Sequence, residues 1–428
     1  MAIVLEGAAV ITMDGENRVL PAADLRIEGE RIMALGEAGA LRRDGDQVLD
    51  CRDRLVVPGF VDTHTHVAAA LFRGLVEDAP RERWRESYAI PGQERFRPED
   101  YLLAARSACC ELLANGVTCI ADRWAGMLSL SEEIARTGIR AIVGHTLTND
   151  KAPAEWPAAE ALLERWGASP AGRVSAGIAP HAPDTCSDAL LRACADAAGK
   201  HGCRLFIHAA QSAWEVERLH ARGYRGLLHC FAENGLTGPH VVAAHCIYLE
   251  EREIADWPAS GISVAHCPAS NLKIEARTMP LHRFLGRTAV GIGTDWTPSD
   301  NAMDMLAETR LAALVGKLLA DDPAALPVMD MLRLATSEGA RVLGLDAVTG
   351  SIEPGKQADL AIFDLGALEA NPRHDLAANL LYSMSARSVR DVMVAGEFLV
   401  RDGRLARFDA SELQREIELV RRRLLLSS

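Results

Sequence analysis

The chain has 428 residues, and 46 lysines and arginines against 59 aspartates and glutamates give a formal net charge of −13. This acidic balance argues against a nucleic-acid partner, because a protein that binds phosphates needs a basic face. No run of eighteen apolar residues is present, so we expect no membrane span, and residues 1–7 lack the basic start and apolar core of a secretory signal. These features predict a cytoplasmic protein.

The ten cysteines predict reduced thiols rather than disulfides. They are scattered, and several fall inside apolar segments, as Cys119, Cys203 and Cys246 do. No Cys-x-x-Cys pair is present, which argues against a zinc site made of thiolates. Small buried thiols in a reducing cytoplasm are the expected outcome.

Both ends of the chain predict β-structure. Residues 1–57 alternate short apolar runs with turn signals, which is typical of a small β unit. After residue 345 the same pattern returns, with predicted strands at 358–364, 389–395 and 398–400. These later strands are expected to complete the first unit, and a polar helix over 411–425 closes the chain.

The central part predicts β/α units, because short apolar runs alternate with stretches of helical period. The eight runs are 56–61, 117–121, 141–144, 174–178, 204–207, 241–244, 263–265 and 289–292. Clear helices lie between them, for example 98–115 and 187–201, each followed by glycine. Eight parallel strands with crossover helices predict a closed (β/α)8 TIM barrel. An open doubly wound sheet is the alternative, but no Gly-x-Gly-x-x-Gly follows the first run to support it.

Four of the thirteen histidines and one aspartate fall where predicted barrel strands end. His64 and His66 form a His-x-His at the first strand, and alternate residues of a strand share one face. His208 ends the fifth strand, His245 ends the sixth, and Asp295 follows the eighth. Strand carboxyl ends surround the active site of this fold. We therefore predict a mononuclear divalent metal site, with zinc favoured by these ligand types and ferrous iron as the alternative.

Three further histidines are predicted to reach the same rim. His181 follows the fourth strand and His266 ends the seventh. We interpret both as contacts to the substrate or to the ligands. His145, after the third strand, is interpreted as structural.

These residues predict hydrolysis at an electrophilic, sp²-hybridised carbon. Water bound to a divalent ion has a pKa near 7, so hydroxide is present at neutral pH. A carboxylate beside it can take the proton and later deliver it to the leaving group. Asp295 is suited to that role, and His245 can hold the hydroxide in line for attack.

Several motifs resemble those of the amidohydrolase superfamily. They are Val57-Pro-Gly-Phe-Val-Asp-Thr-His-Thr-His, Ala244-His-Cys, Ala265-His-Cys-Pro-Ala-Ser-Asn-Leu-Lys, Gly291-Ile-Gly-Thr-Asp and Gly355-Lys-Gln-Ala-Asp-Leu. The chain is most similar to the branch of S-adenosylhomocysteine/methylthioadenosine deaminases and triazine hydrolases, and the similarity extends over nearly the whole chain.

The resemblance implies a metal ion held by His64, His66, His208 and Asp295, with His245 contacting the attacking water. It implies that residues 58–345 form the metal-dependent barrel, flanked by a composite β-sandwich of residues 1–57 and 346–428. His181 matches a histidine that contacts substrate. A small heterocyclic substrate and, by analogy, a homo-oligomer are also implied.

Three positions depart from the family pattern. Gln211 stands where the deaminases carry a glutamate that shuttles a proton, and an amide cannot transfer a proton at neutral pH. Gln93 stands where the adenosine deaminases use glutamate to grip ribose, and Trp296 where relatives usually have glycine. These changes argue against a nucleoside and favour an electron-poor ring that pairs with Gln211. Trp84, Trp124 and Trp296 are candidates to stack on that ring.

The predicted function is therefore metal-dependent removal of ammonia or an amine from a nitrogen heteroaromatic ring. The catalytic residues would be Asp295, His245 and Gln211, and the substrate contacts His181, Gln93, Trp84 and Trp296. Glu215 and Glu217 are expected to point away from the metal. One alternative is loss of halide, which needs no protonation to depart, or opening of a cyclic amide. Another is a metal-binding homologue without catalytic activity.

Overall fold

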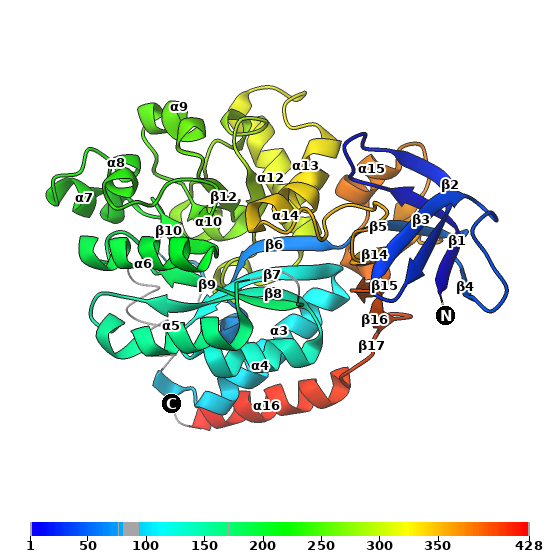
Figure 1. Cartoon of the computed structure of the whole chain (residues 1–428), viewed down its shortest axis with the longest axis horizontal. Helices are drawn as coiled ribbons and strands as arrows, with labels where there is room; N and C mark the ends of the chain where they lie inside the picture. The colour runs from blue at the N-terminus through cyan, green and yellow to red at the C-terminus, as the bar shows by residue number, and fades with distance from the viewer. Residues whose placement is uncertain (1, 76, 80–93, 169–171, 427–428) are drawn as a thin grey trace.

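The computed structural model of the chain describes residues 2–75, 77–79, 94–168 and 172–426. A β/α barrel and a separate β-sheet lie end to end along the longest axis of the molecule (Figure 1). The predicted α/β class and barrel are thereby confirmed. Among the described residues, no helix combines the length and the apolarity that a bilayer crossing requires.

Eight parallel strands form the barrel and pair in chain order. They are β6 (Phe60–Thr65), β7 (Val117–Trp124), β8 (Arg140–Leu147), β9 (Val174–Pro180), β10 (Leu205–Ala209), β11 (Val241–His245), β12 (Ser263–His266) and β13 (Val290–Ile292). Nearly all their residues are buried, as expected of a parallel sheet covered by helices. The segment after β13 meets the end of β6 at a parallel bridge between Asp295 and Thr65.

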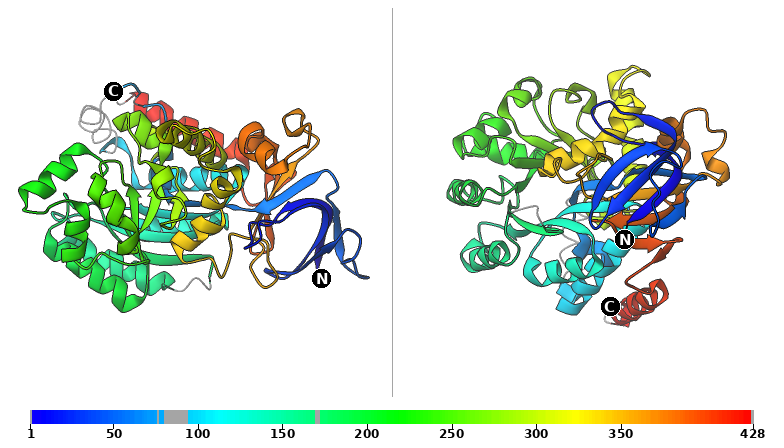
Figure 2. Two further views of the ribbon diagram at one scale, coloured as in Figure 1. Left: turned by 90° about the horizontal axis from the view of Figure 1, so that it is seen from above. Right: turned by 45° about the vertical axis from the view of Figure 1, so that its right-hand side comes forward.

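Helices follow the strands and cover the outside of the barrel (Figure 2). They are η1 (Val67–Phe72), α3 (Pro98–Ala114), α4 (Met127–Thr137), α5 (Ala152–Trp166), α6 (Asp188–His201), α7 (Ala213–Ala221), α8 (Leu227–Glu233), α9 (Glu251–Ser260), α10 (Pro268–Glu275), η3 (Leu281–Arg283), α11 (Thr297–Asp300), α12 (Met305–Ala320), α13 (Val328–Leu334) and α14 (Ser337–Leu343). The two helices singled out in the sequence are α3 and α6. The hydroxyl of Ser187 accepts a hydrogen bond from the Leu190 N–H at the start of α6, and Gly202 ends it with φ +61°.

The run 56–61, predicted as one barrel strand, is divided between the two sheets. Strand β5 (Arg54–Pro58) belongs to the terminal sheet, and β6 begins at Phe60. Gly59 lies between them, where an added Cβ would be 2.1 Å from Cγ2 of Thr118. The prediction of a single strand was wrong, because an apolar run does not reveal which sheet each of its residues joins.

The terminal segments form one hydrogen-bonded sheet of nine strands. Its remaining strands are β1 (Ile3–Ile11), β2 (Val19–Glu28), β3 (Arg31–Glu37), β4 (Gln47–Asp50), β14 (Leu360–Asp364), β15 (Val389–Val394), β16 (Glu397–Arg401) and β17 (Arg404–Leu405). The central pairing of β5 with β14 brings the two ends of the chain together, as predicted. The sheet curls around its own apolar core (Figure 2), which includes Leu25, Val56 and Ile362.

Three short elements precede the last strands: η4 (Leu368–Ala370), α15 (Leu376–Ala378) and η5 (Asn379–Ser383), with η6 (Ala386–Ser388) leading into β15. The chain then returns along the barrel as α16 (Ala410–Leu426), which lies against α3 (Figure 1). An ion pair between Arg423 and Asp100 fixes the end of this helix.

A buried ion pair joins the barrel to the terminal sheet. Arg140, at the start of β8, is 1% exposed, and its Nε donates to Oδ2 of Asp359 at 2.8 Å. The Arg140 guanidinium also donates to Oδ1 of Asp359, to Oε1 of Gln357 and to the carbonyl of Gly172. Every nitrogen of this buried side chain therefore has an acceptor.

All ten cysteines are buried and unpaired, in agreement with the sequence prediction. Burial raises the pKa of Cys119 and of Cys230 to about 12, so these groups remain thiols at neutral pH. They behave as small apolar core residues.

Candidate active site

The carboxyl ends of four barrel strands bring three imidazoles and one carboxylate together. His64 lies on β6, His208 on β10 and His245 on β11, and Asp295 follows β13. One ligand atom of each lies within 4.8 Å of the corresponding atom of every other, and all four residues are buried. This is the convergence that the strand-end positions predict.

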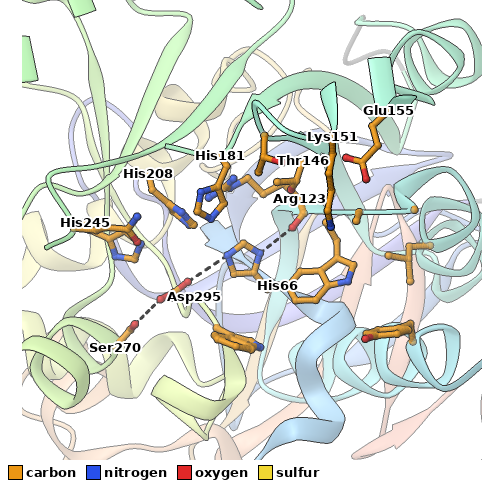
Figure 3. A pocket seen from close by; sticks show the side chains of 18 of the residues that line it. His66, Arg123, Thr146, Lys151, Glu155, His181, His208, His245, Ser270 and Asp295 are labelled. Atoms are coloured by element: carbon orange, nitrogen blue, oxygen red, sulfur yellow. Dashed lines mark hydrogen bonds and ion pairs between the residues drawn. The ribbon is translucent and has the colours of Figure 1, made fainter. Parts of the chain in front are cut away.

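His66 completes the group of five predicted side chains. Its Nε2 lies 3.4 Å from Oδ1 of Asp295, and the Nε2 of His64 lies 3.2 Å from the same oxygen. The Nδ1 of His66 is 2.9 Å from the backbone carbonyl of Arg123, so it carries the proton and donates. Nε2 is therefore the nitrogen left to bind a metal (Figure 3).

The donor set fits a divalent metal ion. The Nε2 of His64 and both ring nitrogens of His208 are buried and have no hydrogen-bond partner among the described residues. Burial lowers the pKa of His64, His66 and His208, which favours the neutral imidazole that coordinates metals. Burial alone would raise the pKa of Asp295, but His245 and His64 hold it below its usual range, which favours the carboxylate. Imidazoles with one carboxylate are typical ligands of zinc.

Two residues of the motif after β12 orient this group. The hydroxyl of Ser270 donates to Oδ2 of Asp295 (Figure 3), and Nδ1 of His245 donates to Oδ1 of Asn271 at 2.9 Å. Sequence reasoning quoted the motif 265–273 but gave neither residue a role. Their position could have indicated a role in the site, since Ser270 and Asn271 lie on α10, which directly follows the end of β12.

The backbone around the site adopts left-handed conformations that are uncommon outside glycine. Asp295 has φ +59°, His245 has φ +78° and Ala210 has φ +45°. Such residues are retained where the surrounding structure holds them, often at functional sites. Here hydrogen bonds hold Asp295 at the barrel seam: its N–H donates to the carbonyl of His64 at 2.8 Å, and its carbonyl accepts from the N–H of His66 at 3.2 Å.

A cavity of about 820 Å³ opens over these side chains, a size suited to a small ligand. One side is an aromatic wall formed by Tyr101, Trp124 and Trp296, with ring centroids 6.3 Å apart for the first pair and 6.4 Å for the second. Trp124 and Trp296 therefore both line the cavity, and their stacking on a ring stays a prediction. The other predicted contacts, Trp84 and Gln93, lie outside the described residues.

Gln211 lines the same cavity, directly after β10. Its N–H and that of Ala210 donate to the two carboxylate oxygens of Glu215, at 2.9 and 2.7 Å. Glu215 is fully buried in this turn, so its carboxylate fixes the loop backbone, and it does not line the cavity. Glu217 is exposed on α7. Both glutamates point away from the cluster, as expected.

His181 also lines the cavity, with its ring centroid 5.0 Å from that of His208. Because the Thr185 hydroxyl donates to the carbonyl of Ala182, its oxygen accepts from Nδ1 of His181 at 2.8 Å. This arrangement leaves Nε2 as the acceptor nitrogen of neutral His181. His266 and His145 do not line the cavity, and Nε2 of His145 lies 3.6 Å from Glu155.

Arg123 is one of several cavity residues that the sequence did not single out. Arg123, near the end of β7, lines the cavity and is 2% exposed. Nothing in its local pattern separates it from an ordinary strand residue, because only the closed barrel places its side chain over the cluster.

The sequence profile of the amidohydrolase family matches residues 55–399. A 5-methylthioadenosine/S-adenosylhomocysteine deaminase from Pelotomaculum thermopropionicum is 32% identical over 422 residues, 97% of each chain. A 5'-deoxyadenosine deaminase from Methanosarcina mazei is 32% identical over 421 residues, 97% of this chain and 96% of the relative.

Solved structures resemble the fold over almost its full length. An adenosine deaminase from Xanthomonas campestris with bound zinc has a TM-score of 0.95 at 30% identity, covering 99% of this chain and 98% of its own. An atrazine chlorohydrolase from Arthrobacter aurescens complexed with zinc has a TM-score of 0.90 at 23% identity, covering 98% and 99%. The second likeness concerns the fold alone.

Proposed function

The chain belongs to the amidohydrolase family, and from this premise we propose that it hydrolyses an aminated nitrogen heteroaromatic ring and releases ammonia. The observation that carries the proposal is the cluster of His64, His208, His245 and Asp295 at the floor of a cavity with an aromatic wall. Such a cavity accepts a flat ring, and the cluster supplies hydrolytic chemistry at one edge of that ring.

We propose that His64, His66, His208 and Asp295 hold one zinc ion, with ferrous iron as the alternative. The buried ring nitrogens of His208, which have no hydrogen-bond partner among the described residues, and the zinc bound in a similar deaminase structure support this assignment. When bound, the ion would acidify a water molecule so that it attacks at neutral pH. His245 would contact that water, since Asn271 holds its Nδ1 and leaves Nε2 facing the cluster.

Asp295 is the group placed to move the proton. Ser270 donates to Oδ2 and so fixes the rotation of the carboxylate while Oδ1 lies toward His64 and His66. The carboxylate would take a proton from the attacking water as the new C–O bond forms. It would return that proton to the amine as the C–N bond breaks, so ammonia leaves neutral.

Gln211 favours a ring that needs no protonation. The adenosine-type deaminases among the relatives act on aminopurine nucleosides by their names. An amide at this position can only donate or accept a hydrogen bond, and general acid assistance is typically worth about 10²–10⁴-fold. We therefore propose an electron-poor amino heterocycle as the substrate. Hydrolytic loss of halide is the second candidate, because halide departs without a proton.

Release of ammonia or halide from a panel of ring compounds tests the proposal. Zinc-loaded protein is assayed with amino- and chloro-substituted pyrimidines, triazines, pterins and purines, and then again after chelation and after metal is restored. We expect release that follows metal content and is absent in Asp295→Asn. An absence of turnover across the panel by the metal-loaded protein would support the catalytically silent alternative. The homo-oligomer, the cytoplasmic location and the domain boundaries stay predictions.

A further inference from the structure

Arg123 is a buried cation that has no hydrogen-bond acceptor among the described residues. Its Nε, Nη1 and Nη2 are all buried, and none has a hydrogen-bond partner among the described residues. A guanidinium carries five N–H donors. Leaving buried donors of a charged group unsatisfied is unfavourable, so such a group in a folded protein calls for a specific explanation.

The charges of Asp295 and Asp122 act on Arg123, but neither carboxylate accepts a hydrogen bond from its guanidinium. No ion pair to Arg123 occurs among the described residues, and Asp122 precedes it on β7 and so faces the opposite side of the strand. Burial lowers the pKa of Arg123 to about 10, which still leaves the guanidinium cationic at neutral pH. The carboxylates farther out along the cavity have other neighbours: Glu275 accepts from the hydroxyl of Tyr248, and Glu155 lies beside His145.

The guanidinium lies at the deep end of the cavity. In Figure 3 the Arg123 side chain runs from β7 toward His181 and His208. A ligand that reaches the cluster therefore meets Arg123 with its reacting ring.

We propose that Arg123 binds an oxygen acceptor carried by the ring of the substrate, so that the substrate is an amino heteroaromatic compound bearing an oxo or carboxylate group. This inference rests on the proposed function. Arginine donors match paired acceptors such as a carboxylate, or the adjacent oxygen and nitrogen at a ring edge. A divalent cation and a guanidinium at the same end of the cavity together favour an anionic partner.

The same contact compensates for Gln211. When hydroxide adds to the ring carbon, the C=N electron pair moves onto the ring and its acceptor oxygen. Arg123 stabilises that negative charge through permanent N–H donors, whereas the amide of Gln211 has no proton to transfer. The electrons then return to the ring, the C–N bond breaks, and the amine leaves with the proton held by Asp295. No oxidant or further reactant is needed.

Binding and turnover of matched rings test the proposal on the zinc-loaded protein. Plain amino rings in pyrimidine, triazine and purine frames (4-aminopyrimidine, melamine and adenine) are compared with oxygen-bearing partners (cytosine, ammelide and isoguanine). The compound 4-aminopyrimidine-5-carboxylate carries a carboxylate and no oxo group, so its binding shows which of the two acceptors is preferred. Quenching of tryptophan fluorescence reports binding, since Trp124 and Trp296 line the cavity. Cyanurate, which has no amine to lose, reports binding without turnover.

We expect at least one oxygen-bearing ring to bind about 30-fold more tightly than its plain partner, as charge-assisted hydrogen bonds do. Arg123→Met should remove that preference and leave metal content unchanged, whereas Arg123→Lys should keep part of it. Lys200→Met removes an exposed cation on α6, outside the cavity, and should change binding less than about threefold.

Two outcomes overturn the proposal. One is that no oxygen-bearing ring binds the wild-type protein better than its plain partner, which needs no variant to fold. The other is that the preference survives in Arg123→Met. Either result can stand beside ammonia release from plain rings, so the proposed function would then hold without this site. Binding of cyanurate through Arg123 with no ammonia from any ring would instead reject the proposed function.

Discussion

Two arginines on neighbouring strands, β7 and β8, are buried to nearly the same extent and have opposite surroundings. Arg140, at the base of the barrel, is 1% exposed and donates to Asp359, Gln357 and Gly172. Arg123, at the rim, is 2% exposed and has no acceptor among the described residues. Arg140 at the base thus has an acceptor for every side-chain nitrogen, while Arg123 at the rim keeps donors available for a ligand. For these two arginines burial alone gives no distinction, whereas their hydrogen bonds do.

The largest expected effect is at the rim. Asp295→Asn should lower kcat by at least about 10³-fold, because the amide cannot accept the proton from water. Metal content and the melting temperature are measured beside the ammonia assay, since the variant is expected to remain folded. Activity within tenfold of wild type would remove Asp295 from its proposed role.

Substitution of Arg140, at the base of the barrel, is expected to lower the stability of the fold rather than the activity. Arg140→Met leaves the Asp359 carboxylate buried without its counter-ion, and loss of one partner of a buried pair costs about 3–5 kcal/mol. The free energy of unfolding is measured by denaturant titration. Arg123→Met is the matched variant and should change that free energy by less than about 1 kcal/mol, since its side chain makes no hydrogen bond among the described residues. Equal losses of unfolding free energy in Arg140→Met and Arg123→Met would show that the two arginines do not differ in their contribution to stability.

Two histidines of the cluster are expected to differ in metal affinity. His66→Ala should weaken zinc binding by more than about 100-fold, and His245→Ala by less than about tenfold, because only His66 is proposed as a ligand. Zinc competition against a chelator measures both. The reverse order would replace His66 by His245 in the ligand set, in line with the close spacing of the His64, His208, His245 and Asp295 atoms.

The smallest effect concerns pH. Burial, together with the neighbouring His245, lowers the pKa of His266 to about 3, from about 6.5 in the unfolded chain. Between these values only the unfolded state binds the proton, so the contribution of His266 to stability is present above pH 6.5 and falls as the pH decreases. His266→Gln should therefore reduce the loss of stability between pH 7 and pH 5 by up to about 2 kcal/mol. His201→Gln, at an exposed site on α6, is the control and should leave the slope unchanged.

The sequence was sufficient for the elements and for the cluster, but not for the contacts around it. Strand periodicity located the barrel strands, and the rule that strand ends share one rim brought His64, His208 and Asp295 together before any coordinates. Arg123 could not be found in this way, because what distinguishes it is the lack of hydrogen-bond acceptors among the described residues, and a sequence does not show that. Ser270 and Asn271 required the geometry of α10 against the seam, and the division at Gly59 required knowledge of Thr118 on the next strand.

The bridge between Thr65 and Asp295 couples closure of the barrel to assembly of the cluster. The residue that closes the cylinder is also the one carboxylate of the cluster, so a molecule with an open seam has its aspartate withdrawn from its imidazoles. A chain in which the barrel has not closed would then lack the proposed metal site. Loss of this bridge is therefore expected to abolish activity rather than to alter substrate specificity.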